Sequence, residues 1–197
     1  MREVTGVILA GGRGLRMGGV DKGLQSLNGR PLVQWVLDRL APQVGTVLIN
    51  ANQNLARYAE FGCPVVPDRI RDFAGPLAGL HAALAYATTP LVATAACDSP
   101  FLPTDLVQRL RNALEAENAE LAVARTGDRA HRAFCLVRCQ LLPQLEAFLA
   151  SGERKVGLWH ASLKLAEVAF DDQPDAFSNI NTREDLAHCG KPPVAPP

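Results

Sequence analysis

The stretch LAGGRGLRMGGVDK, from Leu9 to Lys22, follows directly on an apolar run that begins at Val7. Its five glycines let backbone N–H groups approach an anion closely. Its three cations, Arg13, Arg16 and Lys22, can neutralise the charge of that anion. The stretch therefore predicts a buried strand over residues 7–10 that leads into a phosphate-binding loop.

Two better-known phosphate loops do not match this stretch. A Walker A loop ends in Gly-Lys-Ser/Thr, whereas Lys22 lies between Asp21 and Gly23. The dinucleotide-binding fingerprint that starts at Gly12 would place its third glycine on Met17. On the stretch alone, a flexible surface loop with solvated cations remains an alternative.

The composition of the 197 residues bounds the function classes. The chain has 48% hydrophobic residues and equal numbers, 20 each, of basic and acidic residues, so no overall field favours nucleic acid or an anionic membrane. We expect one domain over residues 1–190, followed by a disordered tail over residues 191–197, where four of seven residues are proline.

The chain shows no secretory signal and no apolar run of transmembrane length, so we expect a cytoplasmic protein. Its five cysteines are odd in number and scattered, without the paired spacing of a zinc site. We interpret them as reduced thiols: Cys63, Cys97, Cys135, Cys139 and Cys189.

Apolar runs alternate with helical stripes through the first 115 residues, which predicts a mainly parallel sheet with helices on both faces. The expected strands cover residues 7–10, 47–49, 65–66 and 91–96, and the expected helices cover 32–40, 77–84 and 106–114. The C-terminal half is less regular, and an antiparallel strand is plausible there. We expect strands at 121–124, 134–137 and 163–170, a helix from Gln140 and a last helix from Thr182.

Polar residues follow each of the first four expected strands. The glycine-rich stretch follows the first strand, and the others lead to Asn50 with Asn52, to Asp68 and to Asp98. Because ligands bind beyond the carboxyl ends of such strands, we expect these groups to meet at one edge of the sheet. Asp98 could hold Mg²⁺ or form a turn or cap. Asp68 could hold a second metal, contact a ribose or cap the segment before Arg69.

Further candidates lie outside these strand ends. The segment from Gly75 to Gly79 could admit a ligand at a helix N-terminus, or be no more than a helix start. Asn179 and Asn181 could bind a polar ring or satisfy turn backbone. Arg154 and Lys155 fit a solvated helix start slightly better than a second phosphate contact. The four histidines show no ligand spacing.

The ordered set of these motifs resembles the molybdenum cofactor guanylyltransferases, a branch of the nucleotidyltransferases with a Rossmann-like α/β fold of three layers. The resemblance covers nearly everything before the tail. The motifs are the stretch from Leu9 to Lys22, Asn50 with Asn52, Pro67-Asp68, Gly75 to Gly79, Cys97-Asp98-Ser99-Pro100, and Asn179 to Thr182.

The resemblance implies transfer of GMP from Mg·GTP to the terminal phosphate of molybdopterin, with the nucleotide bound by the N-terminal half and the acceptor by the C-terminal half. The implied catalytic residues are Lys22, Arg16 and Asp98, and Asp98 is the implied metal ligand. Implied nucleotide-binding residues are Leu9, Ala10, Gly11, Gly12, Lys22, Asn50, Asp68 and Asp98. Implied acceptor-binding residues are Gly75, Gly79, Asn179 and Asn181. We expect a monomer that contacts molybdoenzymes or their chaperones transiently.

Two positions depart from the family pattern. Arg132 follows His131 where relatives often have His-Pro, and Arg183 follows Thr182 where Thr-Pro is usual. Both lie on the expected acceptor side. Two rivals stay open: a transferase that uses CTP on the pterin or another nucleotide on a sugar phosphate, and a non-catalytic nucleotide-binding regulator.

Overall fold

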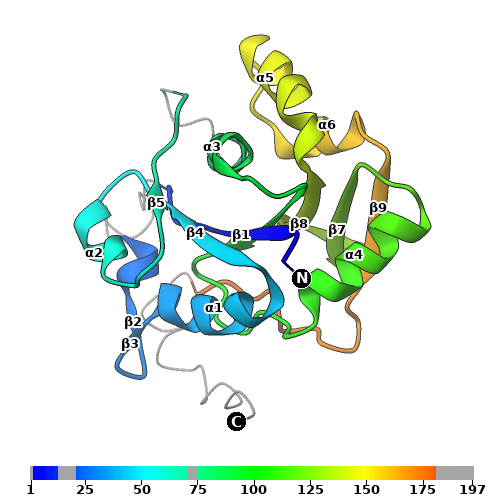
Figure 1. Cartoon of the computed structure of the whole chain (residues 1–197). Helices are drawn as coiled ribbons and strands as arrows, with labels where there is room; N and C mark the ends of the chain where they lie inside the picture. The colour runs from blue at the N-terminus through cyan, green and yellow to red at the C-terminus, as the bar shows by residue number, and fades with distance from the viewer. Residues whose placement is uncertain (1, 13–20, 71–74, 181–197) are drawn as a thin grey trace.

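The computed structural model describes residues 2–12, 21–70 and 75–180. The predictions for Arg13, Arg16 and Asn181, for the helix from Thr182 and for the 191–197 tail lie outside the described residues. The main sheet has seven strands in the order β5-β4-β1-β6-β8-β7-β9 (Figure 1). Their bounds are β1 Val4–Leu9, β4 Thr46–Asn50, β5 Val65–Val66, β6 Leu91–Ala96, β7 Leu121–Thr126, β8 Arg129–Arg138 and β9 Leu165–Ala169.

The first four strands in the sheet order run parallel, as their continuous apolar sequences predict. Strand β1 lies between two parallel neighbours, with Val7 opposite Leu48 of β4 and Thr94 of β6. Strand β8 runs antiparallel to both β6 and β7, whereas β9 runs parallel to β7. This confirms the α/β fold with an antiparallel strand in the C-terminal half.

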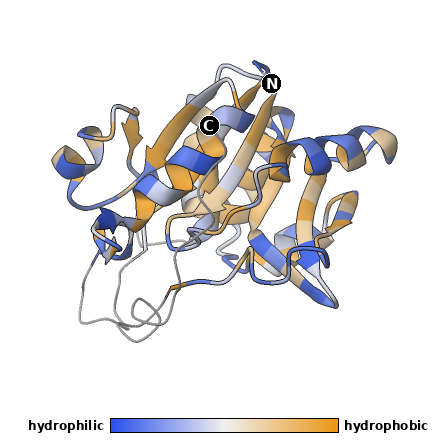
Figure 2. Cartoon of the chain, turned by 90° about the horizontal axis from the view of Figure 1, so that it is seen from below, coloured by the Kyte–Doolittle hydropathy of each residue, from blue (hydrophilic) through white to orange (hydrophobic). Residues whose placement is uncertain are grey.

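Helices cover both faces of the sheet and complete the three layers (Figure 1). Helices α1 (Leu32–Leu40) and α4 (Leu106–Ala116) lie on one face, where α1 packs on β1 and α4 packs on β7, β8 and β9. Helices α3 (Pro76–Tyr86), α5 (Leu142–Ala150) and α6 (Val156–Ala161) lie on the other face, where α3 packs on β1 and β4 and α5 packs on α3. Figure 2 shows the largely hydrophobic strands beside helices with hydrophilic outer surfaces.

Several helices and strands begin or end at residues other than the predicted ones. Strand β1 begins three residues earlier than expected and ends at Leu9, so Ala10 has left the strand. A 3-10 turn, η4 (Cys139–Leu141), precedes helix α5, so the α-helix begins later than Gln140. Strand β9 is shorter than its expected range.

Several short elements escaped the sequence analysis. They are the 3-10 turns η2 (Lys22–Leu24) and η3 (Ala41–Gln43), helix α2 (Leu55–Ala59), helix α6, and a hairpin of β2 (Ser26–Leu27) and β3 (Arg30–Pro31). Asn28 and Gly29 form the hairpin turn with φ values of 52° and 80°, as expected of an Asn-Gly pair between two strands.

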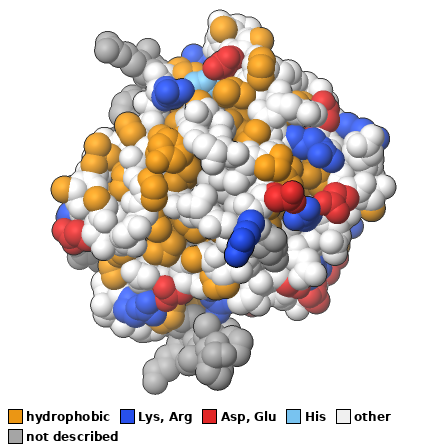
Figure 3. All heavy atoms as spheres, in the orientation of Figure 1, with side chains coloured by type: hydrophobic (Ala, Val, Ile, Leu, Met, Phe, Trp, Pro, Cys, Tyr) orange, Lys and Arg blue, Asp and Glu red, His pale blue; other side chains and the backbone are white. Residues whose placement is uncertain are grey.

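The surface shows no large block of one charge on the face in Figure 3, where acidic and basic side chains are interspersed with hydrophobic ones. Within residues 2–12, 21–70 and 75–180, no helix combines the length and the apolar character that a bilayer span requires.

Candidate active site

The carboxyl ends of β4, β1 and β6 meet at one edge of the sheet. Leu9, the last residue of β1, lies opposite Asn50 of β4 and Ala96 of β6 in the strand register. Two residues beyond Ala96 the chain reaches Asp98, and β5 on the outer side leads toward Asp68. The parallel register therefore brings the polar groups after these strands to a common edge.

Lys22 and Asp98 form an ion pair at this edge. The Lys22 Nζ donates to Asp98 Oδ2 at 3.2 Å, although 76 residues separate the two in the chain. The exposed fraction is 25% for the Lys22 side chain and 11% for that of Asp98. A carboxylate so far removed from water needs a cation or hydrogen-bond donors beside it. Asp98 therefore suits a site where another cation can take the place of the Lys22 ammonium.

Asp68 joins Asn50, the last residue of β4, to Asn52 just beyond the strand. Asn50 Nδ2 donates to Asp68 Oδ1 at 2.9 Å, and Asn52 Nδ2 donates to Asp68 Oδ2 at 2.8 Å. The Asp68 backbone N–H returns a hydrogen bond to Asn52 Oδ1 at 2.9 Å. Each oxygen of the Asp68 carboxylate accepts a hydrogen bond from an amide. The geometry therefore favours a role for Asp68 in orienting Asn50 and Asn52, and it does not favour the alternative role of a metal ligand.

The same asparagines border two glycines at which an added Cβ would force a neighbouring side chain to shift. A Cβ at Gly79 would lie 2.4 Å from Asn50 Oδ1 and 2.8 Å from Leu9 Cδ2. A Cβ at Gly11 would lie 2.8 Å from Asn52 Nδ2, whose amide also donates to the Gly11 carbonyl at 3.1 Å. These contacts join the start of the glycine-rich stretch to the amide cluster.

Gly75 and Asn179 have conformational roles in the structure. Gly75 precedes helix α3 with φ 66° and ψ −154°, a conformation that essentially only glycine adopts. Asn179 Oδ1 accepts a hydrogen bond from Ser99 Oγ at 2.8 Å, and the Ile180 N–H donates to the Asp98 carbonyl at 2.9 Å. The C-terminal segment thus returns to the Asp98 end of β6.

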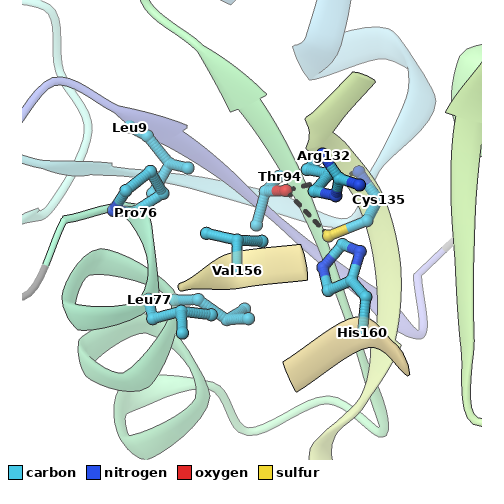
Figure 4. A pocket seen from close by; sticks show the side chains of 9 residues that line it. Leu9, Pro76, Leu77, Thr94, Arg132, Cys135, Val156 and His160 are labelled. Carbon is cyan, nitrogen blue, oxygen red and sulfur yellow. Dashed lines mark hydrogen bonds between the residues drawn. The ribbon is translucent and has the colours of Figure 1, made fainter. Parts of the chain in front are cut away.

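A small pocket opens between β1, β6, β8, α3 and α6, with room for about one water molecule (Figure 4). One side is apolar and the other carries Thr94, Arg132, Cys135 and His160; the complete lining is Leu9, Pro76, Leu77, Leu80, Thr94, Arg132, Cys135, Val156 and His160. The pocket therefore combines an apolar wall with a cationic rim.

The charge of this rim comes from Arg132 and not from His160. The Arg132 guanidinium lies against Gly157, where an added Cβ would be 3.2 Å from its Nε. Burial, with the Arg132 charge adding to it, lowers the pKa of His160 to about 4, so the imidazole is neutral at pH 7. The exposed guanidinium remains available to an anion at this rim.

Arg154 and Lys155 lie before helix α6, as a solvated helix start predicts. Lys155 occupies the N-cap position of that helix. The Arg154 guanidinium donates to the carbonyls of Leu149 and Glu153, both at 2.7 Å. These contacts do not favour the alternative of a second phosphate contact.

A metal ion at this edge of the sheet would be held by a single carboxylate of the protein. In the described part of the chain, no group of three or more His, Cys, Asp or Glu side chains could hold a metal ion. Mg²⁺ is commonly held by one or two carboxylates together with substrate phosphates, and Asp98 matches that donor set. The described cysteines are free thiols, and burial raises the pKa of Cys135 to about 11.

Sequence reasoning missed three residues next to Lys22. The Tyr58 hydroxyl donates to Asp21 Oδ1 at 2.5 Å, and Asn54 Nδ2 donates to Asp21 Oδ2 at 3.0 Å. Both partners belong to the segment around α2, which has no clear helical stripe in the sequence. No sequence pattern considered above connects Asp21 with this segment.

Comparisons with known proteins show the family of the chain. Residues 6–164 match the MobA-like NTP transferase domain. A molybdenum cofactor guanylyltransferase of Cupriavidus taiwanensis is 56% identical over 189 residues, which cover 93% of this chain and 94% of that protein. A molybdenum cofactor guanylyltransferase of Bordetella petrii is 50% identical over 188 residues, which cover 93% and 95%.

Two solved structures share the fold. The molybdopterin-guanine dinucleotide biosynthesis protein A of Archaeoglobus fulgidus has a TM-score of 0.77 at 24% identity, covering 93% of this chain and 95% of that one. The 4-diphosphocytidyl-2C-methyl-D-erythritol synthase of Anaerococcus prevotii has a TM-score of 0.70 at 15% identity, covering 94% and 93%. With the domain match and the relatives of 50% identity or more, these findings show that the chain belongs to the MobA-like NTP transferase family.

Proposed function

We propose that this chain transfers GMP from GTP to the terminal phosphate of molybdopterin, which yields the guanine dinucleotide cofactor and pyrophosphate. The contact between Lys22 and Asp98 carries the proposal, because it places a cation and a carboxylate together beside the glycine-rich stretch. The activity named for the relatives at 50–56% identity supports the choice of substrates.

The nucleotide base is assigned to the edge formed by β1 and β4. Backbone groups of Leu9, Ala10, Gly11 and Gly12 would face the guanine, since Gly11 and Gly12 leave room for a purine. Asn50, oriented by its 2.9 Å hydrogen bond to Asp68, would complete this site. Guanine presents N–H donors, and Asn50 offers its Oδ1 as an acceptor, since its two N–H groups already bond Asp68 and the Val66 carbonyl.

We assign the triphosphate to the part of the sheet edge where the side chains of Lys22 and Asp98 meet, with Arg16 as a further contact. Family members that use GTP generally need a divalent metal, and we propose Mg²⁺ held by Asp98 and the phosphates. The bound ion would supply charge neutralisation at the α-phosphate. Lys22 would then leave Asp98 for a phosphate oxygen, which makes its amine a cation poised for the substrate.

The reaction is an in-line displacement with no covalent enzyme intermediate. An oxygen of the acceptor phosphate forms a bond to the α-phosphorus of GTP while the bond to the bridging α–β oxygen breaks, and pyrophosphate leaves with that electron pair. Two unit charges about 4 Å apart repel by about 4 kcal/mol at an effective dielectric of about 20, so cations at the junction are required. A phosphate monoester is largely ionised at neutral pH and needs no general base.

The acceptor is assigned to the β6 and β8 side of the edge, near Asn179, with Gly75 and Asn181 kept as expected contacts. Gly79 lies against Asn50 and Leu9 instead, so we assign it to the nucleotide side. Because β8 runs antiparallel to β6, its first residues lie at the Asp98 end of the sheet. We keep the expectations of a monomer, of transient contacts with molybdoenzymes or their chaperones, and of a cytoplasmic location, where GTP is made.

A cytidylyl transfer is the second candidate, because the fold is shared with a cytidylyl-type synthase and does not select the base. The test measures pyrophosphate release from GTP, CTP and ATP with molybdopterin and Mg²⁺. GTP should be the substrate that supports release. Preference for CTP would contradict the guanylyl assignment, and tight GTP binding without product would indicate a non-catalytic regulator.

A further inference from the structure

We infer that Tyr58 and Asn54 are positioning residues for the Lys22 ammonium, which they act on through the Asp21 carboxylate. The inference rests on the proposed role of Lys22 and assigns a function to a helix that no sequence motif marked. Three observations carry it: the hydrogen bonds of Asp21, the burial of Tyr58 and the contact of Gly23.

Both oxygens of the Asp21 carboxylate are held by neutral donors. Tyr58 donates to Oδ1 at 2.5 Å and Asn54 donates to Oδ2 at 3.0 Å, from positions 37 and 33 residues away in the chain. Hydrogen bonds to a charged acceptor are shorter and stronger than those between neutral groups. The residue directly before Lys22 is therefore attached to the α2 segment at two points.

The donor at Tyr58 is fixed in position and in protonation state. Tyr58 is fully buried at 0% exposure and packs in the core on the α1 side of the sheet. Burial raises the pKa of its hydroxyl far above the usual range, and the hydrogen bond to Asp21 adds to this effect. The hydroxyl is therefore protonated at neutral pH and donates to Asp21.

The residue directly after Lys22 contacts the same tyrosine. A Cβ at Gly23 would lie 2.5 Å from the Tyr58 hydroxyl and 3.4 Å from the Cβ of Cys97. Only glycine at this position allows the turn to approach Tyr58 so closely. Lys22 therefore lies between two neighbours that are both placed by Tyr58.

The backbone carries this placement to the lysine. Lys22 is the first residue of η2, and the Gln25 N–H donates to its carbonyl at 3.0 Å. The Leu24 N–H donates to the Asp21 carbonyl at 3.3 Å, which closes the same turn. With the turn fixed, the long Lys22 side chain has fewer conformations to lose when it holds a phosphate.

The test is a double-mutant cycle of Tyr58→Phe and Lys22→Ala. In the wild-type background, Tyr58→Phe removes the donor to Asp21 and should lower kcat for GMP transfer about 10-fold, since small misplacements of catalytic groups are costly. In the Lys22→Ala background the same change should cost less than about 2-fold, because the group it positions is gone. Tyr86→Phe, at an exposed tyrosine outside the site, is the matched control and should leave kcat unchanged.

A purely structural role gives a different result. Equal losses from Tyr58→Phe in both backgrounds, or no loss in either, would overturn the inference. Should Tyr58→Phe not fold, Asn54→Ala replaces it in the same cycle, with a smaller loss expected because Asn54 is exposed. The Kd of GTP with Mg²⁺ is measured for the same four proteins of the cycle. This second measurement tests the inference even if the wild-type protein transfers no GMP and the proposed function fails.

Discussion

Replacement of Gly79 by alanine should weaken GTP binding without unfolding the protein. The new Cβ would lie 2.4 Å from Asn50 Oδ1, about 1 Å inside ordinary contact, so the Asn50 amide must move by a comparable distance. That shift disturbs the hydrogen bonds of Asn50 Nδ2 to Asp68 at 2.9 Å and to the Val66 carbonyl at 3.1 Å.

The magnitude follows from these contacts. Leaving a hydrogen-bonding group of the neutral base unpaired costs about 1–3 kcal/mol, so the Kd of GTP should rise about 5- to 150-fold if the displaced amide no longer meets the base. Stability should change less, because overpacking costs about 1–3 kcal/mol while alanine favours the helix by about 1 kcal/mol over glycine.

The assay is calorimetric titration of GTP with Mg²⁺ into Gly79→Ala, together with urea unfolding. Asn50→Ala provides the matched background, because it removes the closer of the two side chains that the new Cβ would meet and leaves Leu9 Cδ2 at 2.8 Å. There, Gly79→Ala should lower the free energy of unfolding less than it does in the wild-type background. Wild-type GTP affinity in the single Gly79→Ala variant would refute the assignment of Asn50 to the nucleotide site.

Three further perturbations test other parts of the site. Lys22→Ala and Asp98→Ala should each lower the turnover of GMP transfer about 10²–10³-fold while the circular dichroism spectrum is retained, and wild-type turnover would refute their roles. Arg132→Gln should raise the KM of the anionic acceptor about 10-fold and leave the KM of GTP unchanged. An acceptor KM equal to that of the wild-type protein would show that Arg132 does not contact the acceptor. Burial and the Arg132 charge lower the pKa of His160 from 6.5 to about 4. Because the unfolded chain then binds a proton that the folded protein does not, the free energy of unfolding should fall by up to ~3 kcal/mol as the pH drops from 6.5 toward 4. His160→Gln should reduce this acid sensitivity in urea unfolding at pH 7.5 and 4.5, and an unchanged difference would contradict the assignment.

The sequence predicted the central strands well because their apolar character is continuous. Strands β5 and β6 have the expected bounds, and the α1 stripe is buried as its spacing requires. The edge where the strands end also followed from the sequence, since parallel strands all deliver their carboxyl ends to the same side.

The contacts that position the site were beyond sequence reasoning. The Asn28-Gly29 turn is a recognisable signal, but its flanking strands have two residues each and show no alternation. The bond from Tyr58 to Asp21 joins segments 37 residues apart and depends on how α2 packs. The side chains of Arg132 and His160 meet at one pocket only because β8 and α6 pack together on the α3 side of the sheet.

The most direct test of the account is a crystal structure of the protein with a non-hydrolysable α,β-methylene analogue of GTP and Mn²⁺ in place of Mg²⁺. The account predicts an anomalous peak about 2.1 Å from a carboxylate oxygen of Asp98, with Lys22 moved onto a phosphate oxygen. A triphosphate and metal bound away from these two side chains, with their 3.2 Å contact intact, would contradict it.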